Sequence, residues 1–153
     1  MIEVREAEPQ HRPETARLAR RVNEGIRKVY QIQSDLGWRK SGSAERIQLV
    51  ATLGDAVVGA ASLAHRGERT HLLGLYVDPD YKGFGVAGRL VEAVTRLARQ
   101  RGAKCLTLAT LRETGNVPLF ERLGFEVVEE HETRIVQGAA GAAMREACME
   151  RLL

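Results

Sequence analysis

The sequence is poor in aromatic residues and cysteine, and it contains no long apolar run. Phe, Trp and Tyr make up 5% of its 153 residues, and there are 2 cysteines. So few cysteines exclude a disulfide-rich secreted scaffold, and a membrane-spanning helix would need about 20 consecutive apolar residues. No secretory signal is visible either. We therefore expect a cytoplasmic protein without a membrane partner, whose Cys105 and Cys148 are reduced and buried.

A large excess of charge of one sign is also absent. The formal net charge is +3 at pH 7. Basic residues are frequent in a predicted amphipathic helix that opens at Pro13, but Glu14 and Glu24 are interleaved with them. No set of aromatic residues for base stacking accompanies them. We interpret this basic face as solvated and expect no nucleic-acid partner.

The composition, with 44% hydrophobic and 28% charged residues, is typical of one soluble domain spanning residues 1–153. There is no internal repeat and no interdomain linker. Residues 30–43 lack periodicity and are predicted to form a loop. Alternation and turn signals predict strands at residues 2–7, 48–53, 56–65, 69–77, 104–109, 125–134 and 144–152.

Residues 72–101 join a strand, a glycine loop and a helix without interruption. Asp78-Pro79-Asp80 ends the strand, and Gly83, Gly85 and Gly88 precede or open the helix. The first N–H groups of a helix have no internal partner, and glycines let a phosphate approach them closely. Lys82 and Arg89 add positive charge at the two ends of the loop. The stretch therefore predicts an anion-binding site.

Two familiar nucleotide motifs fit this loop poorly. A Walker loop would end in Gly-Lys-Ser or Gly-Lys-Thr, whereas the chain has Gly88-Arg89-Leu90. The spacing GxGxxG is present, but a Rossmann unit needs an acidic residue at the end of its second strand, and residues 107–110 contain none. A Rossmann-like nucleotide enzyme is the weaker alternative.

Residues 77–90 closely resemble the acetyl-coenzyme A loop of the GNAT N-acetyltransferases, whose pattern is Gln/Arg-x-x-Gly-x-Gly/Ala. Lys82 stands at the leading position in place of Arg or Gln, Gly85 at the central glycine and Ala87 at the last small residue. A second mark, from Leu106 through Asn116 to Phe125, resembles the strand, Asn-containing turn and Gly-Phe helix end of the same family. Together the two marks cover about the C-terminal half of the chain up to Phe125.

The resemblance implies a fold, a cofactor and a reaction. The fold is α/β (α+β), a mixed, mainly antiparallel sheet of six or seven strands with helices on both faces, splayed after the strand ending at Val77. The reaction is transfer of the acetyl group of acetyl-coenzyme A to a primary amine by direct attack in a ternary complex. The implied cofactor-binding residues are Leu75, Tyr76, Val77, Lys82, Gly83, Phe84, Gly85, Val86, Ala87, Gly88, Arg89, Asn116 and Phe120.

The resemblance also suggests catalytic groups. The main-chain N–H groups of Leu75, Tyr76 and Val77 would bind the acetyl carbonyl, with Leu75 as the chosen donor. His71 is a candidate general base, because an alternation of two residues predicts that it shares a strand face with Leu75 and Val77; the alternative is a structural histidine. Phe120 replaces a tyrosine that acts as general acid in many GNAT enzymes. An acyl-coenzyme A sensor of the same fold is therefore the alternative function.

The acceptor amine, on a small molecule, a protein or a peptide, is not identified by the sequence. In GNAT proteins the segment after the first helix helps to form the acceptor pocket, so Tyr30, Asp35 and Trp38 are candidates for it. Trp38 is equally explained as a core residue under a loop. Asn116 either binds the pantetheine arm or only forms a turn. No metal ligands are assigned, and an exposed last strand at residues 144–152 would permit a homodimer.

Overall fold

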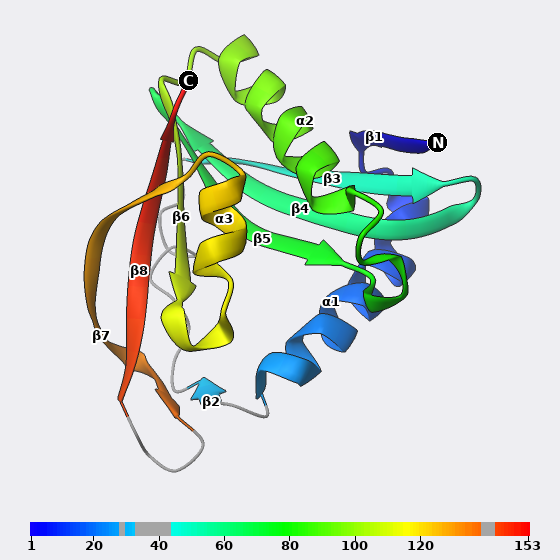
Figure 1. Cartoon of the computed structure of the whole chain (residues 1–153). Helices are drawn as coiled ribbons and strands as arrows, with labels where there is room; N and C mark the ends of the chain where they lie inside the picture. Colours follow the sequence, from blue (N-terminus) through cyan, green and yellow to red (C-terminus); the bar gives the residue numbers. More distant parts are fainter. Residues whose placement is uncertain (28–29, 33–43, 139–142) are drawn as a thin grey trace.

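The computed structural model describes residues 1–27, 30–32, 44–138 and 143–153 (Figure 1). Over these residues, eight strands form one sheet in the order β1-β3-β4-β5-β6-β8-β7-β2. The β5–β6 pair is parallel, and every other neighbouring pair is antiparallel. The predicted mixed, mainly antiparallel sheet is confirmed. A doubly wound parallel sheet, and with it the Rossmann alternative, is excluded.

Tight turns connect the strands of the N-terminal half. The turn at Gly54-Asp55 is the predicted hairpin, and Gly54 adopts a positive φ of 61° that favours glycine. Gly67 adopts a φ of 58° in the next turn. The strands of this half are β1 (Ile2–Glu6), β3 (Glu45–Leu53), β4 (Ala56–Arg66) and β5 (Arg69–Val77).

The C-terminal half contains β6 (Cys105–Leu111), β7 (Glu126–Gly138) and β8 (Ala143–Leu152). β8 lies between β6 and β7 and pairs with both. The prediction that this last strand is exposed is therefore wrong, and the argument for a homodimer that rested on it is removed. The loop predicted for residues 30–43 is also corrected in part. Tyr30–Ile32 forms β2, which pairs with β7.

Helices cover both faces of the sheet, as predicted. α1 (Arg12–Arg27) packs against β4 and β5 on one face, and α2 (Val86–Gln100) and α3 (Val117–Arg122) lie on the other (Figure 1). Gly59 of β4 sets how closely α2 approaches, because a Cβ there would lie 2.7 Å from Val86 Cγ1 and 3.0 Å from the Tyr76 carbonyl oxygen. The described residues also include the short 3-10 helices η1 (Pro9–His11), η3 (Pro79–Tyr81) and η4 (Arg112–Thr114).

The main core lies between the sheet and the helices α2 and α3. Leu63, Leu90, Leu106 and Met149 are at most 1% exposed there. Burying a side chain of this size contributes roughly 1.5–3 kcal/mol, so these residues hold α2 on the sheet. The β4 residues that alternate with Leu63 point to the other face of the sheet, toward α1.

The two cysteines are free, and they differ in burial. Cys105 is buried, as predicted, but Cys148 is half-buried, which corrects the sequence-based expectation. None of the helices in the described part of the chain is both long enough and apolar enough to cross a bilayer.

Candidate functional site

The sheet opens between its two parallel strands. The β5–β6 ladder joins Arg69–His71 to Cys105–Thr107, and in the described structure no further residue pairs connect the two strands. Beyond His71, β5 continues to Val77 paired with β4, and β6 continues to Leu111 paired with β8. The two strands therefore diverge, and the predicted splay begins at His71 and Thr107, within the strands.

Main-chain N–H groups of β5 face this opening. The N–H of Asp78 donates to the Val58 carbonyl of β4 at 2.9 Å. Backbone groups of successive strand residues are directed to opposite sides, so the N–H groups of Val77 and Leu75 are directed toward the opening. The N–H of Tyr76 is directed toward β4, and Tyr76 is thereby removed from the expected main-chain donors.

The prediction that His71 shares a face with Leu75 and Val77 is wrong. In the β4–β5 ladder Leu72 pairs with Leu63 and Gly74 pairs with Ser62, so Leu73 is an extra residue in a β-bulge. A bulge shifts the alternation by one residue. His71 therefore lies on the α1 face of β5, whereas Leu75 and Val77 lie on the α2 face.

His71 lies at the point where the two strands separate. Its Nδ1 is 2.8 Å from Oγ1 of Thr107 on β6. Burial disfavours the charged imidazolium and lowers the pKa of His71 from 6.5 to about 4. The imidazole is thus neutral at pH 7, which a base requires, but its low pKa makes it a weak proton acceptor.

Tyr76 occupies the same face as His71, next along the strand beyond Gly74. Its ring folds back over Gly74, so that a Cβ on Gly74 would lie 2.8 Å from the Tyr76 hydroxyl oxygen. Only a glycine leaves room for this ring position. The hydroxyl therefore lies over the part of β5 that no longer pairs with β6.

The glycine loop leads into α2 at the end of β5. Gly83 and Gly85 have φ values of 86° and 77°, and Gly85 is the N-cap of α2. An ideal Cβ on either glycine would meet no other atom within 4 Å. The space beside these glycines is open, and the N–H groups of Val86, Ala87 and Gly88 lie in the first turn of the helix, where intrahelical partners are lacking.

Two contacts fix the start of this loop. Asp78 accepts from the N–H of Asp80 at 2.9 Å, and its carboxylate also binds the Arg21 guanidinium at 2.9 Å. Arg21 belongs to the basic face of α1 and is 47% exposed, so it is solvated as expected and also ties α1 to the loop. The sequence gives no local signal for this contact, because the partners are 57 residues apart.

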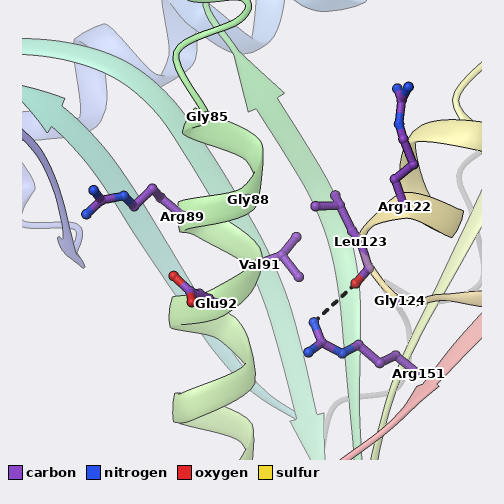
Figure 2. Close-up of a pocket in the computed structure, with 9 residues that line it drawn as sticks. All are labelled: Gly85, Gly88, Arg89, Val91, Glu92, Arg122, Leu123, Gly124 and Arg151. Carbon is purple, nitrogen blue, oxygen red and sulfur yellow. Dashed lines mark hydrogen bonds between the residues drawn. The ribbon is translucent and has the colours of Figure 1, made fainter.

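A groove of about 520 Å³ runs between α2 and the end of α3 (Figure 2). Gly85 and Gly88 line one side, and Arg122, Leu123 and Gly124 line the other. Arg151 of β8 closes the groove by donating from Nη1 to the Leu123 carbonyl at 3.2 Å. Arg122 and Arg151 were not among the predicted site residues, and Arg151 comes from a distant strand.

Of the two basic residues predicted at the ends of the loop, Arg89 lines the groove and Lys82 does not. Lys82 is exposed. Arg89 donates to the Ile2 carbonyl of β1 at 3.4 Å, and Figure 2 shows it on the opposite side of α2 from Arg122. Two cationic side chains lie across the groove from α2, those of Arg122 and Arg151, and Figure 2 shows Arg151 extended toward the helix.

A family model described as the acetyltransferase (GNAT) family matches residues 13–125. The chain belongs to the GNAT family of acetyltransferases. The GNAT match includes nearly all of α1, the opening between β5 and β6, the glycine loop and α3, whereas Arg151, which closes the groove, lies beyond it.

Solved structures share the GNAT fold at low sequence identity. A GCN5-related N-acetyltransferase from Kribbella flavida has a TM-score of 0.78 and 20% identity, covering 99% of this chain and 98% of that chain. A ribosomal-protein-alanine N-acetyltransferase from Brucella melitensis has a TM-score of 0.71 and 18% identity, covering 99% of both chains. An acetyltransferase from Bacillus anthracis in complex with acetyl coenzyme A has a TM-score of 0.75 and 12% identity, covering 100% of both. No curated protein matches the sequence.

The second GNAT mark forms α3 and the turn before it. Asn116 is the N-cap residue of α3, but its side chain makes no capping hydrogen bond. The side-chain amide of Asn116 therefore does not cap the helix. Phe120 is 8% exposed, and its ring packs edge-on against Phe125 with centroids 5.9 Å apart. Phe120 is thus a core residue, and any contact with a cofactor is limited to a small exposed edge.

The residues predicted to form an acceptor pocket belong to the segment that follows α1. Tyr30 lies in β2, whose backbone pairs with Gly138 of β7. Asp35 and Trp38 lie outside the described residues. An acceptor pocket formed by these three residues therefore stays a prediction.

Proposed function

We propose that this protein is an N-acetyltransferase that moves the acetyl group of acetyl-coenzyme A to a primary amine. The observation that carries the proposal is the opening between β5 and β6, which lies directly before the glycine loop and the N-terminus of α2. A thioester placed in this opening would be close to the N–H groups of β5 and to an anion-binding helix start at once.

The loop and groove fit the phosphates of the coenzyme. The space beside Gly83 and Gly85 is open to a ligand, and both backbone conformations favour glycine. Anions are stabilised at a helix N-terminus, and Arg122 adds a positive charge across the groove. We therefore assign the diphosphate to the first turn of α2 and one further phosphate to Arg122.

The chemistry required of the protein is modest. Acetyl-coenzyme A supplies an acetyl thioester, whose carbonyl oxygen gains negative charge when an amine attacks. The N–H groups of Leu75 and Val77 are directed toward the opening and can donate to that oxygen. The Tyr76 hydroxyl and His71 lie on the α1 face, which we assign to the incoming amine, opposite the face that carries the groove.

Proton transfer has no strong candidate among the predicted residues. Phe120 has no proton to donate, and a thiol with a pKa near 8.5 can leave as the thiolate without one. His71, with a pKa of about 4, accepts a proton only from an amine whose own pKa is lowered or through water. We infer that the amine enters largely in its neutral form and that His71 positions it by hydrogen bonding.

The burial of Phe120 and the low pKa of His71 favour a second candidate function. A GNAT protein without an effective acid and base can bind acyl-coenzyme A and respond to it without turnover. In this function the groove and the glycine loop keep their roles, and the opening holds the acyl group without passing it on.

The experiment that tests the proposal has two stages. Calorimetry with acetyl-coenzyme A, coenzyme A and NAD should show binding of the first two alone. A panel of small amines, amino acids, polyamines and N-terminal peptides is then assayed for thiol release. Acetylated product from at least one amine supports the enzyme, binding without product supports the sensor, and no binding of either coenzyme contradicts both.

A further inference from the structure

Four side chains with metal-binding chemistry meet on β7 and β8, on the sheet face opposite the groove. His131 pairs with Glu146 across the two strands, and Glu129 pairs with Cys148. The residues that alternate with them on β8, Ala147 and Met149, are fully buried in the core beneath α2 and α3. Glu146 and Cys148 therefore project from the other face.

The distances between these groups are short. Nε2 of His131 is 3.4 Å from Oε1 of Glu146, and one ligand atom each of His131, Glu146 and Cys148 lies within 4.8 Å of the other two. Nδ1 of His131 is 3.9 Å from Oε1 of Glu129. In the described part of the chain, this is the group of histidine, cysteine and carboxylate side chains whose spacing suits one metal ion.

The donor set selects for zinc. Zinc binds imidazole nitrogen, thiolate sulfur and carboxylate oxygen at about 2.0–2.3 Å, whereas calcium and magnesium prefer oxygen ligands alone. The 3.4 Å between His131 Nε2 and Glu146 Oε1 already suits two ligands of one tetrahedral ion, whose ligand atoms are roughly 3.3–3.7 Å apart. Small side-chain rotations of His131 and Glu146, without movement of the strands, would complete the approach to Cys148.

We propose that His131 Nε2, Glu146 and Cys148 bind a zinc ion and that Glu129 orients the imidazole from outside the coordination sphere. Histidine ligands commonly donate their second N–H to a carboxylate, and Glu129 lies beside Nδ1 for that purpose. Burial, together with Glu146 and Glu129, raises the pKa of Cys148, so the cation would displace the proton of a neutral thiol on binding. Three protein ligands leave the fourth position open to water or another ligand.

The arrangement depends on strand register. Glu146 and Cys148 are two residues apart on β8, and Glu129 and His131 are two residues apart on β7, so all four point the same way. A bulge at Val128 of β7 sets this register, because Val127 pairs with Met149 and Glu129 with Cys148. Without the extra residue, Glu129 and His131 would face the core side of the sheet.

Cobalt spectroscopy on a Cys105→Ala protein tests the sulfur ligand directly, because Cys148 is then the remaining thiol. Added Co²⁺ should produce the thiolate-to-cobalt charge-transfer band together with the visible bands of a tetrahedral site. Zn²⁺ should displace the Co²⁺ and remove both signals, and Mg²⁺ in excess should not. A Co²⁺ spectrum without a thiolate band contradicts the proposal.

Zinc titrations of matched variants test the other ligands. Loss of a carboxylate that only orients a ligand weakens metal binding by about 10–100-fold, so Glu129→Gln should weaken Zn²⁺ binding by about 10-fold. Loss of a ligand itself should cost more. We expect a loss of at least about 100-fold for each of Cys148→Ser, His131→Gln and Glu146→Gln. His65→Gln is the control, because His65 is paired with Thr70 at 2.9 Å outside this cluster. Coenzyme A affinity, measured in the same proteins, should not change. Equal Zn²⁺ affinity in the parent and in Cys148→Ser, with both proteins folded by circular dichroism, overturns the site.

Discussion

Replacing Gly88 by alanine should make the protein more stable and its coenzyme binding weaker at the same time. Gly88 lies inside α2, where alanine is favoured over glycine by about 0.5–1 kcal/mol. An ideal Cβ at this position meets no atom nearer than Leu123 Cδ2 at 4.0 Å, an ordinary contact. Gly88 is in the first turn, where the preference for alanine is smaller than in a helix interior, so the rise in melting temperature should be at most about 1–4 °C.

The same methyl group would enter the groove between α2 and α3, which Gly88 and Leu123 line. If the coenzyme diphosphate approaches the first turn of α2, the methyl group occupies part of its path. We expect coenzyme A to bind at least about tenfold more weakly, equivalent to about 1.4 kcal/mol. Stability and affinity thus change in opposite directions, so a general loss of structure cannot imitate the result.

Thermal unfolding without ligand and calorimetry with coenzyme A measure the two effects separately. Gly54→Ala is the control for binding, because Gly54 has a φ of 61° in the turn between β3 and β4 and does not line the groove. It should lower stability and leave coenzyme A binding unchanged. A Gly88→Ala protein that is more stable and binds coenzyme A like the parent would refute the placement of the diphosphate at α2.

Three further predictions follow from the geometry of the site. The pKa of His71 is about 4 in the folded protein, below its usual 6.5. As the pH falls, the unfolded chain therefore takes up the proton first. The free energy of unfolding should drop by about 3 kcal/mol between pH 6.5 and 4. His71→Asn should lack this drop, as measured by urea unfolding at pH 7 and pH 4.5. Phe120→Ala should lower the free energy of unfolding by about 3–5 kcal/mol, since it leaves a cavity beside Phe125; a loss below 1 kcal/mol would show that the ring is not a core element. Arg122→Met should weaken coenzyme A binding by about 1 kcal/mol in a salt-sensitive way, while Arg20→Met on the exposed side of α1 should not.

The sequence by itself determined the elements whose cause is local. The Gly54-Asp55 hairpin and the glycine loop before α2 were both predicted, because a positive φ and a break in periodicity are properties of neighbouring residues. Spacing and residue type in the loop, together with the Asn116–Phe125 stretch, were enough to indicate the GNAT family, which the match over residues 13–125 confirmed.

Only the tertiary structure decided which side chains meet. The bulge at Leu73 moved His71 to the α1 face, and nothing in the alternation of the sequence marks that extra residue. Arg151 reaches Leu123, and Cys148 meets Glu146 and His131, because β8 enters between β6 and β7. Strand order and register depend on the packing of the whole core and on contacts between distant residues, whereas propensity and spacing act over a few residues at a time.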